Sequence, residues 1–140
     1  MTRLPHTLTQ MTISGRSMRV PRYFEDVYRR AAVGRGTFIT REQIDSLNPL
    51  DVLSILAYVK GVQTFNRGVK FSGCPDINYG EVYVDGQRLT RFSTLNDALR
   101  MVTPRAIQAM EIYTRQSAVP GEFLDAQPCA VVAIWTKRGP

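Results

Sequence analysis

The chain has 140 residues, of which 44% are hydrophobic and 21% are charged, and its formal net charge is +6. This length fits one domain with a core of its own, and the composition is that of an ordinary globular protein. The longest uncharged, mainly apolar stretches, residues 52–59 and 129–135, are far shorter than the ~20 residues of a membrane-spanning helix, so no transmembrane segment is expected.

The positive charge is concentrated near the N-terminus. Residues 1–41 hold eight arginines and two acidic residues, whereas residues 42–140 hold ten basic and ten acidic side chains. We therefore expect a basic N-terminal arm over residues 1–36 and a folded domain over residues 37–140. Arginine suits paired hydrogen bonds to carboxylates and phosphates, although a solvated lead-in explains the same distribution. The candidate partner-binding residues are Arg16, Arg19, Arg22, Arg29, Arg30 and Arg35.

The first predicted elements are mainly helical. Residues 11–14 fit a short strand, and apolar side chains at helical spacing predict a helix over residues 21–32, ended by two following glycines. Thr40 and Gln43 have the spacing of a capping box, which predicts a short helix through Leu47.

A further helix is expected to begin at Asn48-Pro49. Asparagine is a good N-cap, and proline fits the first helical position. This helix should run to about Val59, where Gly61 stops it. Its apolar stripe, expected to face the core, consists of Leu50, Leu53, Leu56 and Ala57.

The second half of the chain is dominated by short strands. They are predicted over residues 62–65, 69–71, 81–84, 109–114 and 129–137. The first two should form a hairpin, and Asp85-Gly86 should reverse the chain after the third. Thr94 and Asp97 should cap a helix to about Val102, and Thr103-Pro104 should start one more helical turn. The last strand is apolar on both faces and should therefore be central, which gives an α+β fold: a small mixed sheet with short flanking helices.

Two cysteines, Cys74 and Cys129, leave two alternatives open: free buried thiols or one disulfide. Each precedes or opens a predicted strand, and a disulfide is favoured if these two strands are neighbours. It would stabilise the fold by roughly 4 kcal/mol and would imply an oxidising compartment. Residues 1–20 lack the apolar stretch of a secretory signal. Either a leader was removed, or the protein is cytoplasmic and its thiols are free.

The order of these motifs resembles the plug domain of TonB-dependent outer-membrane receptors. The resemblance covers about residues 38–137 and rests on Ile44, Leu47, Pro49, Leu53 and Leu56 before Val59-Lys60-Gly61-Val62, on Val82-Tyr83-Val84-Asp85-Gly86, on Ile107 with Met110-Glu111-Ile112-Tyr113, and on residues 130–136. It implies a plug-like fold and a periplasmic or outer-membrane-associated location.

Three positions depart from the family pattern. Lys60 stands where proline is usual, Arg115-Gln116 where Gly-Pro is common, and Cys129-Ala130 where two glycines often stand. We identify no TonB box near the N-terminus. A 22-stranded receptor barrel needs on the order of 200 further residues, so we expect a plug-type fold used alone or cut from a longer protein, without a transporter's gating role.

We predict no catalytic or metal site and no cofactor. The one histidine, His6, lies in a segment with no predicted order, and Glu111 and Asp85 have no implied acid–base partner. We therefore expect a non-enzymatic accessory subunit that docks on a larger membrane-associated protein assembly, with anionic lipid headgroups as a further partner of the arm. The main alternative is a ligand- or glycan-binding module whose lip is residues 116–127. Nucleic acid is disfavoured, because the aromatic residues of the arm have helical spacing.

Overall fold

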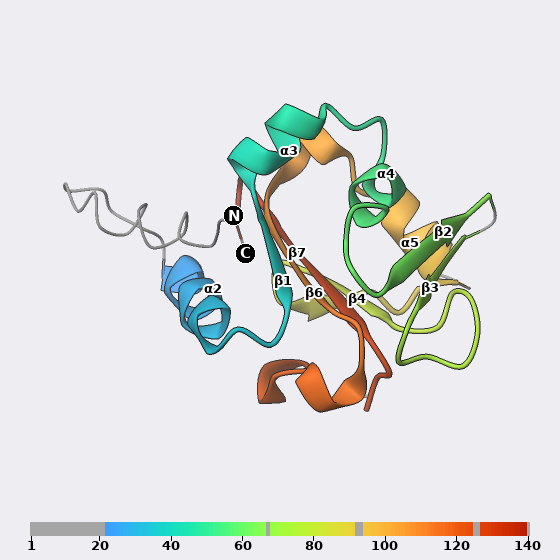
Figure 1. Cartoon of the computed structure of the whole chain (residues 1–140). Coiled ribbons are helices and arrows are strands. Elements are labelled where there is room, and N and C mark those ends of the chain that lie inside the picture. Colours follow the sequence, from blue (N-terminus) through green and yellow to red (C-terminus); the bar gives the residue numbers. More distant parts are fainter. Residues whose placement is uncertain (1–21, 67, 92–93, 125–126, 140) are drawn as a thin grey trace. The chain divides into compact units, whose positions relative to one another are not determined.

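The computed structural model describes residues 22–66, 68–91, 94–124 and 127–139, with side chains from residue 24 onward (Figure 1). Contacts within the chain divide it into two units, residues 1–34 and 35–140. The predicted strand over residues 11–14 and the histidine at position 6 lie outside the described residues.

The described part of the first unit is helix α2 (Arg22–Val33), which confirms the predicted helix. Glu25 lies in its first turn and Arg30 in its last turn, where the helix dipole favours each charge. The rings of Phe24 and Tyr28, one turn apart, stack with centroids 6.0 Å apart. Gly34 follows with a φ of 79°, a left-handed conformation that commonly ends helices.

The second unit is a mixed α/β domain, in agreement with the predicted fold. Its longer elements are β1 (Thr37–Thr40), α3 (Arg41–Leu47), α4 (Val52–Leu56), β2 (Val62–Phe65), β3 (Gly68–Phe71), β4 (Glu81–Val84), β5 (Gln87–Arg88), α5 (Leu95–Arg100), β6 (Ile107–Tyr113) and β7 (Val131–Thr136). Three 3₁₀ turns complete it: η1 (Pro104–Ala106), η2 (Gln116–Ala118) and η3 (Gly121–Phe123).

Five strands form one sheet in the order β1-β6-β7-β4-β5, and β2 and β3 form a separate two-stranded ribbon. The last strand, β7, is central, parallel to β4 and antiparallel to β6. Every residue from Val131 to Trp135 is buried, because both faces of this strand are covered. The prediction of a central, doubly covered last strand is therefore confirmed.

The main core lies on one face of this sheet. Alternate residues of the strands, including Met110, Ile112, Val132 and Ile134, pack in one buried cluster. Side chains of α3, α4, α5 and β3 complete the cluster, and Figure 1 shows α4 and α5 beside the β2–β3 ribbon. The apolar side chains of the main core therefore lie on this face of the sheet. The opposite face carries a different set of side chains.

The predicted helix start at Asn48-Pro49 was wrong. Asn48 is the C-cap of α3: its φ is 48°, and its backbone N–H donates to the carbonyl of Ile44. Asp51 is instead the N-cap of α4, since its carboxylate accepts from the backbone N–H of Ser54 at 2.9 Å. Asparagine tolerates the left-handed conformation, so the same residue type suits either end of a helix.

This later start also changes the buried stripe of α4. Leu50 precedes the helix and is 92% exposed, while Val52, Ile55 and Leu56 are buried. Of the predicted stripe, Leu56 is buried, Leu53 packs partly against the core and Ala57 is exposed. Moving the helix start by three residues changes the set of positions that faces the core.

Smaller differences concern the strand ends. β6 begins at Ile107 instead of residue 109 and has an irregular register between Ile107 and Ala109. The turn after Thr103 is a 3₁₀ turn of three residues. Within the described residues, no helix combines the length and the apolar composition needed to cross a membrane.

Candidate functional site

The predicted arginine set is divided between the two units. Arg16 and Arg19 lie outside the described residues, and Arg22 begins α2. Arg29 is exposed and lies 3.3 Å from the carboxylate of Asp26, a surface pair of the kind that contributes little to stability. Arg30 is only 6% exposed, and Arg35 is exposed at the start of the second unit.

Cys74 and Cys129 form a disulfide, with their Cα atoms 5.2 Å apart. Cys74 lies in the loop before β4, and Cys129 lies two residues before β7. Because β4 and β7 are parallel neighbours, the bond links the segments that precede two adjacent strands. The pairing favoured for neighbouring strands is thus present, and the cytoplasmic alternative, which required free thiols, loses its support.

Asp85 joins the opposite ends of the same two strands. Its two carboxylate oxygens accept from the backbone N–H of Thr136 at 2.8 Å and from the Thr136 hydroxyl at 2.7 Å. Its φ of 52° and the φ of 87° at Gly86 turn the chain tightly from β4 into β5. The Asp-Gly turn predicted from sequence is therefore also a cross-strand clamp.

The second face of the sheet carries a buried carboxylate among aromatic rings. Glu111 on β6 is fully buried and accepts from the Tyr113 hydroxyl at 2.6 Å and from the Trp135 indole N–H at 2.7 Å. Phe123 of η3 packs nearby, with ring centroids 4.8 Å from Tyr83 and 6.3 Å from Tyr113. Tyr113 and Trp135 are both buried and are core aromatic residues of this face.

Sequence reasoning missed this cluster, although a signal for it was present. Glu111 and Tyr113 are two residues apart in a strand, so they point to the same face. An acidic residue inside a strand whose neighbours are apolar requires a hydrogen-bond partner, because an unpaired buried charge is very costly. The proposed lip, residues 116–127, is partly structural as well, since Phe123 lies under the sheet.

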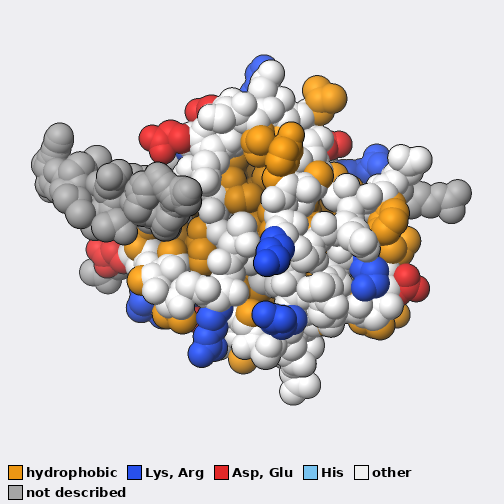
Figure 2. Space-filling view, viewed as in Figure 1, with side chains coloured by type: hydrophobic (Ala, Val, Ile, Leu, Met, Phe, Trp, Pro, Cys, Tyr) orange, Lys and Arg blue, Asp and Glu red, His pale blue; other side chains and the backbone are white. Residues whose placement is uncertain are grey.

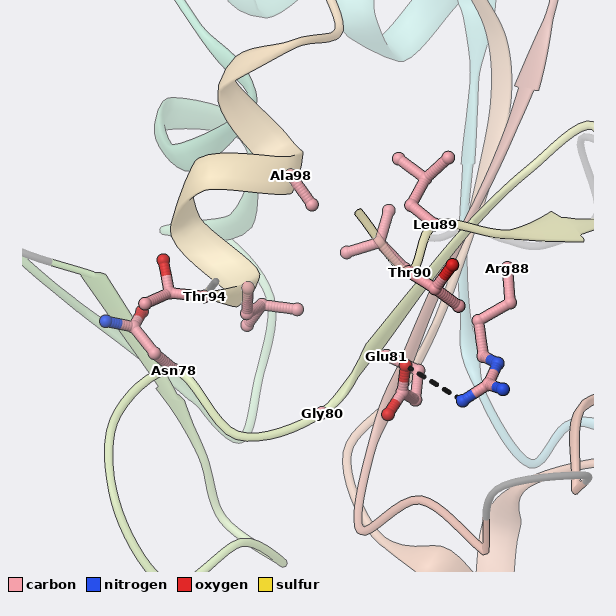
Figure 3. Close-up of a pocket in the computed structure, with 10 residues that line it drawn as sticks. Asn78, Gly80, Glu81, Arg88, Leu89, Thr90, Thr94 and Ala98 are labelled. Atoms are coloured by element: carbon pink, nitrogen blue, oxygen red, sulfur yellow. Dashed lines mark ion pairs between the residues drawn. The ribbon is translucent and has the colours of Figure 1, made fainter. Parts of the chain in front are cut away.

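Described residues form three hollows that we consider on the surface of the second unit. The first, with a volume of about 270 Å³, lies between β4, β5 and the start of α5. Figure 3 shows Arg88 and Glu81 facing each other on one side of it, with Asn78 and Thr94 on the other. The closest oxygen–nitrogen distance between Arg88 and Glu81 is 3.8 Å.

The second hollow continues from the first, whereas the third has a lining of its own. The second, of about 430 Å³, shares Arg88, Leu89 and Thr90 with the first and extends to Met101. The third, of about 760 Å³, lies between the α3–α4 connection and η1 and is lined by Leu50 and Arg105. We call these three hollows together the grooved surface. Figure 2 shows apolar side chains gathered in the middle of the visible face, with basic side chains beside and below them.

One arginine helps to build the third hollow. The Arg41 guanidinium pairs with the Asp45 carboxylate at 2.6 Å and donates to the carbonyl oxygens of Pro104 and Ile107. It therefore ties α3 to η1, which form opposite walls of this hollow. In the described part of the chain, no cluster of three or more histidine, cysteine or acidic residues could hold a metal ion.

Comparison with solved structures identifies similar folds. The siderophore receptor PirA from Pseudomonas aeruginosa is 22% identical, with a TM-score of 0.55 over 75% of this chain and 19% of the receptor. The alcaligin outer-membrane receptor FauA from Bordetella pertussis is 20% identical, with a TM-score of 0.52 over 74% of this chain and 18% of the receptor. The RagAB peptide importer is 19% identical, with a TM-score of 0.54 over 74% of this chain and 12% of that chain.

This chain thus spans less than a fifth of the length of these proteins. No curated protein matches it. The family model described as the TonB-dependent receptor plug domain matches residues 29–123, more than half of the chain. With the sheet order and the Asp-Gly turn described above, this match shows that the chain belongs to the TonB-dependent receptor plug domain family.

Proposed function

We propose that this plug domain is a non-enzymatic interaction domain that docks, as an accessory or structural subunit, on a larger membrane-associated protein assembly on the extracytoplasmic side. The grooved surface carries this proposal. Its hollows have walls that combine exposed apolar side chains with arginines, a composition typical of protein interfaces.

Leu50 and Met101 supply the apolar contacts of this surface. They are 92% and 64% exposed, and each lines a hollow instead of packing into the core. A large apolar side chain held at the edge of a concave surface is suited to act as an anchor for a partner. Arg88 and Arg105, both exposed, provide positive charge along the same surface.

The burial and hydrogen bonding of the Glu111 carboxylate also favour a binding role over a catalytic one. Glu111 has no exposed surface, and both of its oxygens accept hydrogen bonds from aromatic side chains. A general acid or base must reach the reacting group of a substrate. This carboxylate is placed to hold the sheet together instead.

The extracytoplasmic location rests on the disulfide, since such bonds persist in oxidising compartments. The arm would then add attraction to an anionic partner, either acidic protein or lipid headgroups, through its arginines. This contribution should weaken as salt rises, because exposed charges are screened over about 10 Å at 0.1 M.

The test is to bind the full chain to native membranes and to compare two leucine variants. Leu50→Gln removes an apolar anchor of the grooved surface, and Leu124→Gln changes an exposed leucine that lines none of the three hollows. Loss of one buried leucine contact of about 1.5 kcal/mol should weaken binding about tenfold. Equal binding by both variants, or no membrane-protein complex at all, would contradict the proposal.

The second candidate function is a ligand- or glycan-binding module. The hollow in Figure 3 favours it, because Asn78, Thr90 and Thr94 present an amide and two hydroxyl groups beside the Arg88–Glu81 pair. Saturable calorimetric binding of a small sugar or metabolite, lost in Thr94→Val but kept in Leu50→Gln, would favour this function over docking.

A further inference from the structure

The two edges of the β2–β3 ribbon differ. On the β3 side, the Asn78 backbone N–H donates to the carbonyl of Val69 at 2.7 Å, and its side-chain oxygen accepts from the Val69 N–H at 3.2 Å. These two bonds close that edge as a neighbouring strand would. On the other side, β2 has no further strand neighbour within the described residues.

The register identifies the backbone groups that face the open edge. The Ser72 N–H donates to the Gly61 carbonyl at 2.8 Å, so Gly61 and Ser72 form a hydrogen-bonded pair. Hydrogen-bonded and non-bonded pairs alternate along an antiparallel ladder. Gln63 and Phe65 therefore bond to β3, whereas the N–H and C=O of Thr64 point away from it.

Apart from its short length of four residues, this strand lacks the features that usually protect an open edge. Natural proteins cover such edges or place a charge, a proline or a bulge in them. β2 reads Val-Gln-Thr-Phe, and its pairing with β3 has a continuous register. Its residues from Gln63 to Phe65 are exposed, and half of the Phe65 surface is accessible.

The segment of sequence that contains β2 and β3 is positively charged. From residue 52 to residue 75 the sequence contains three basic residues and no acidic residue. Lys60 precedes β2 and is exposed, and Lys70 lies opposite Gln63 on β3. An extended partner segment with acidic side chains would therefore find a positive charge at the start of the strand.

We propose that β2 binds an extended, acidic segment of the partner protein by strand addition. Backbone hydrogen bonds at Thr64 would give the pairing, Phe65 would contact an apolar side chain, and Lys60 would select for acidic residues. This inference rests on the proposed docking function and names the chemistry of the partner. With one outward-facing N–H, strand addition here should be weak by itself and should add to contacts elsewhere.

The test uses synthetic peptides of about eight residues, an ordinary strand length, in which valine and threonine alternate with glutamate. Matched peptides replace glutamate by lysine or carry methylated backbone nitrogens. Thr64→Pro removes the outward N–H without touching a β2–β3 bond, and Thr64→Val keeps that N–H and a β-branched side chain. Binding to the full chain is followed by fluorescence anisotropy and by amide shifts.

We expect the acidic peptide to bind and to shift the amide signal of Thr64. Thr64→Pro should weaken this binding about tenfold, and Thr64→Val should change it by less than about threefold. If the proline variant does not fold, loss of binding by the methylated peptide gives the same support. Equal binding of the lysine peptide, unchanged binding to a folded proline variant, or no binding below about 1 mM would overturn the inference.

Two further outcomes separate this inference from the docking proposal. If Thr64→Pro binds native membranes as the unmodified chain does, while Leu50→Gln does not, docking stands and strand addition is wrong. If the chain alone forms dimers that Thr64→Pro abolishes, the occupant is a second copy of the chain, and our assignment of a partner segment is wrong. Sedimentation at several concentrations measures this.

Discussion

Reducing the Cys74–Cys129 bond should lower the stability of the second unit by about 4 kcal/mol. The two cysteines are 55 residues apart in sequence. Closing a loop of this length removes on the order of 14 cal/mol/K of entropy from the unfolded chain, which is about 4 kcal/mol at room temperature. For a unit of about 100 residues, a loss of this size should lower the melting temperature by about 15–20 °C.

The assay is urea unfolding of the full chain with and without a thiol reductant, followed by far-ultraviolet circular dichroism. Reduction removes the cross-link without deleting an atom from the core, where Cys74 is 5% exposed. The unfolded chain should also become more expanded, so the m-value should rise on reduction. The variant Cys74→Ala/Cys129→Ala is the control, because its stability should not respond to the reductant.

A loss below about 1 kcal/mol, with an unchanged m-value, would refute this reasoning. It would mean that the unfolded chain already keeps the segments before β4 and β7 close together without the bond. A loss seen equally in the double-alanine variant would show that the reductant acts elsewhere.

Three further substitutions test the contacts described above. Asp85→Ala should lower stability by about 2 kcal/mol, because it removes both bonds to Thr136; an unchanged urea midpoint would contradict the clamp. Tyr113→Phe should lower the free energy of unfolding by about 1.5–3 kcal/mol, since the Glu111 carboxylate loses one donor in a buried site. If the double variant Glu111→Gln/Tyr113→Phe loses no more stability than Glu111→Gln alone, the two side chains are energetically coupled. Gly68→Ala should speed amide exchange in β3, because an added Cβ would lie 2.0 Å from the asparagine oxygen that closes its outer edge; unchanged exchange would contradict that role.

The sheet could be predicted from the sequence because its strands carry strong local signals. β7 is apolar on both faces, and the Asp85-Gly86 turn fixes where β4 ends. Local signals failed at Asn48, which serves equally well as an N-cap and as a left-handed C-cap. The choice is made by packing, since a start at Asp51 buries Ile55.

The candidate site depended much more on tertiary structure. The third hollow joins residues around Leu50 with residues around Arg105, and no local pattern reports such a juxtaposition. The hydrogen bond between Glu111 and Trp135 likewise depends on the pairing of β6 with β7. The outer edge of β3 is closed because Asn78 folds back and bonds to Val69. The spacing of turn residues in the sequence does not predict this contact.

The position of β7 in the chain has a consequence for how this domain is made. It is the central strand of the five-stranded sheet, and the other four strands of that sheet precede it in the sequence. A growing chain therefore carries β6 and β4 with their inner edges unpaired until β7 is synthesised, and non-local pairing of this kind is slow. The nascent polypeptide should stay unfolded and in need of chaperone protection until that moment, a state compatible with passage through a narrow secretion channel.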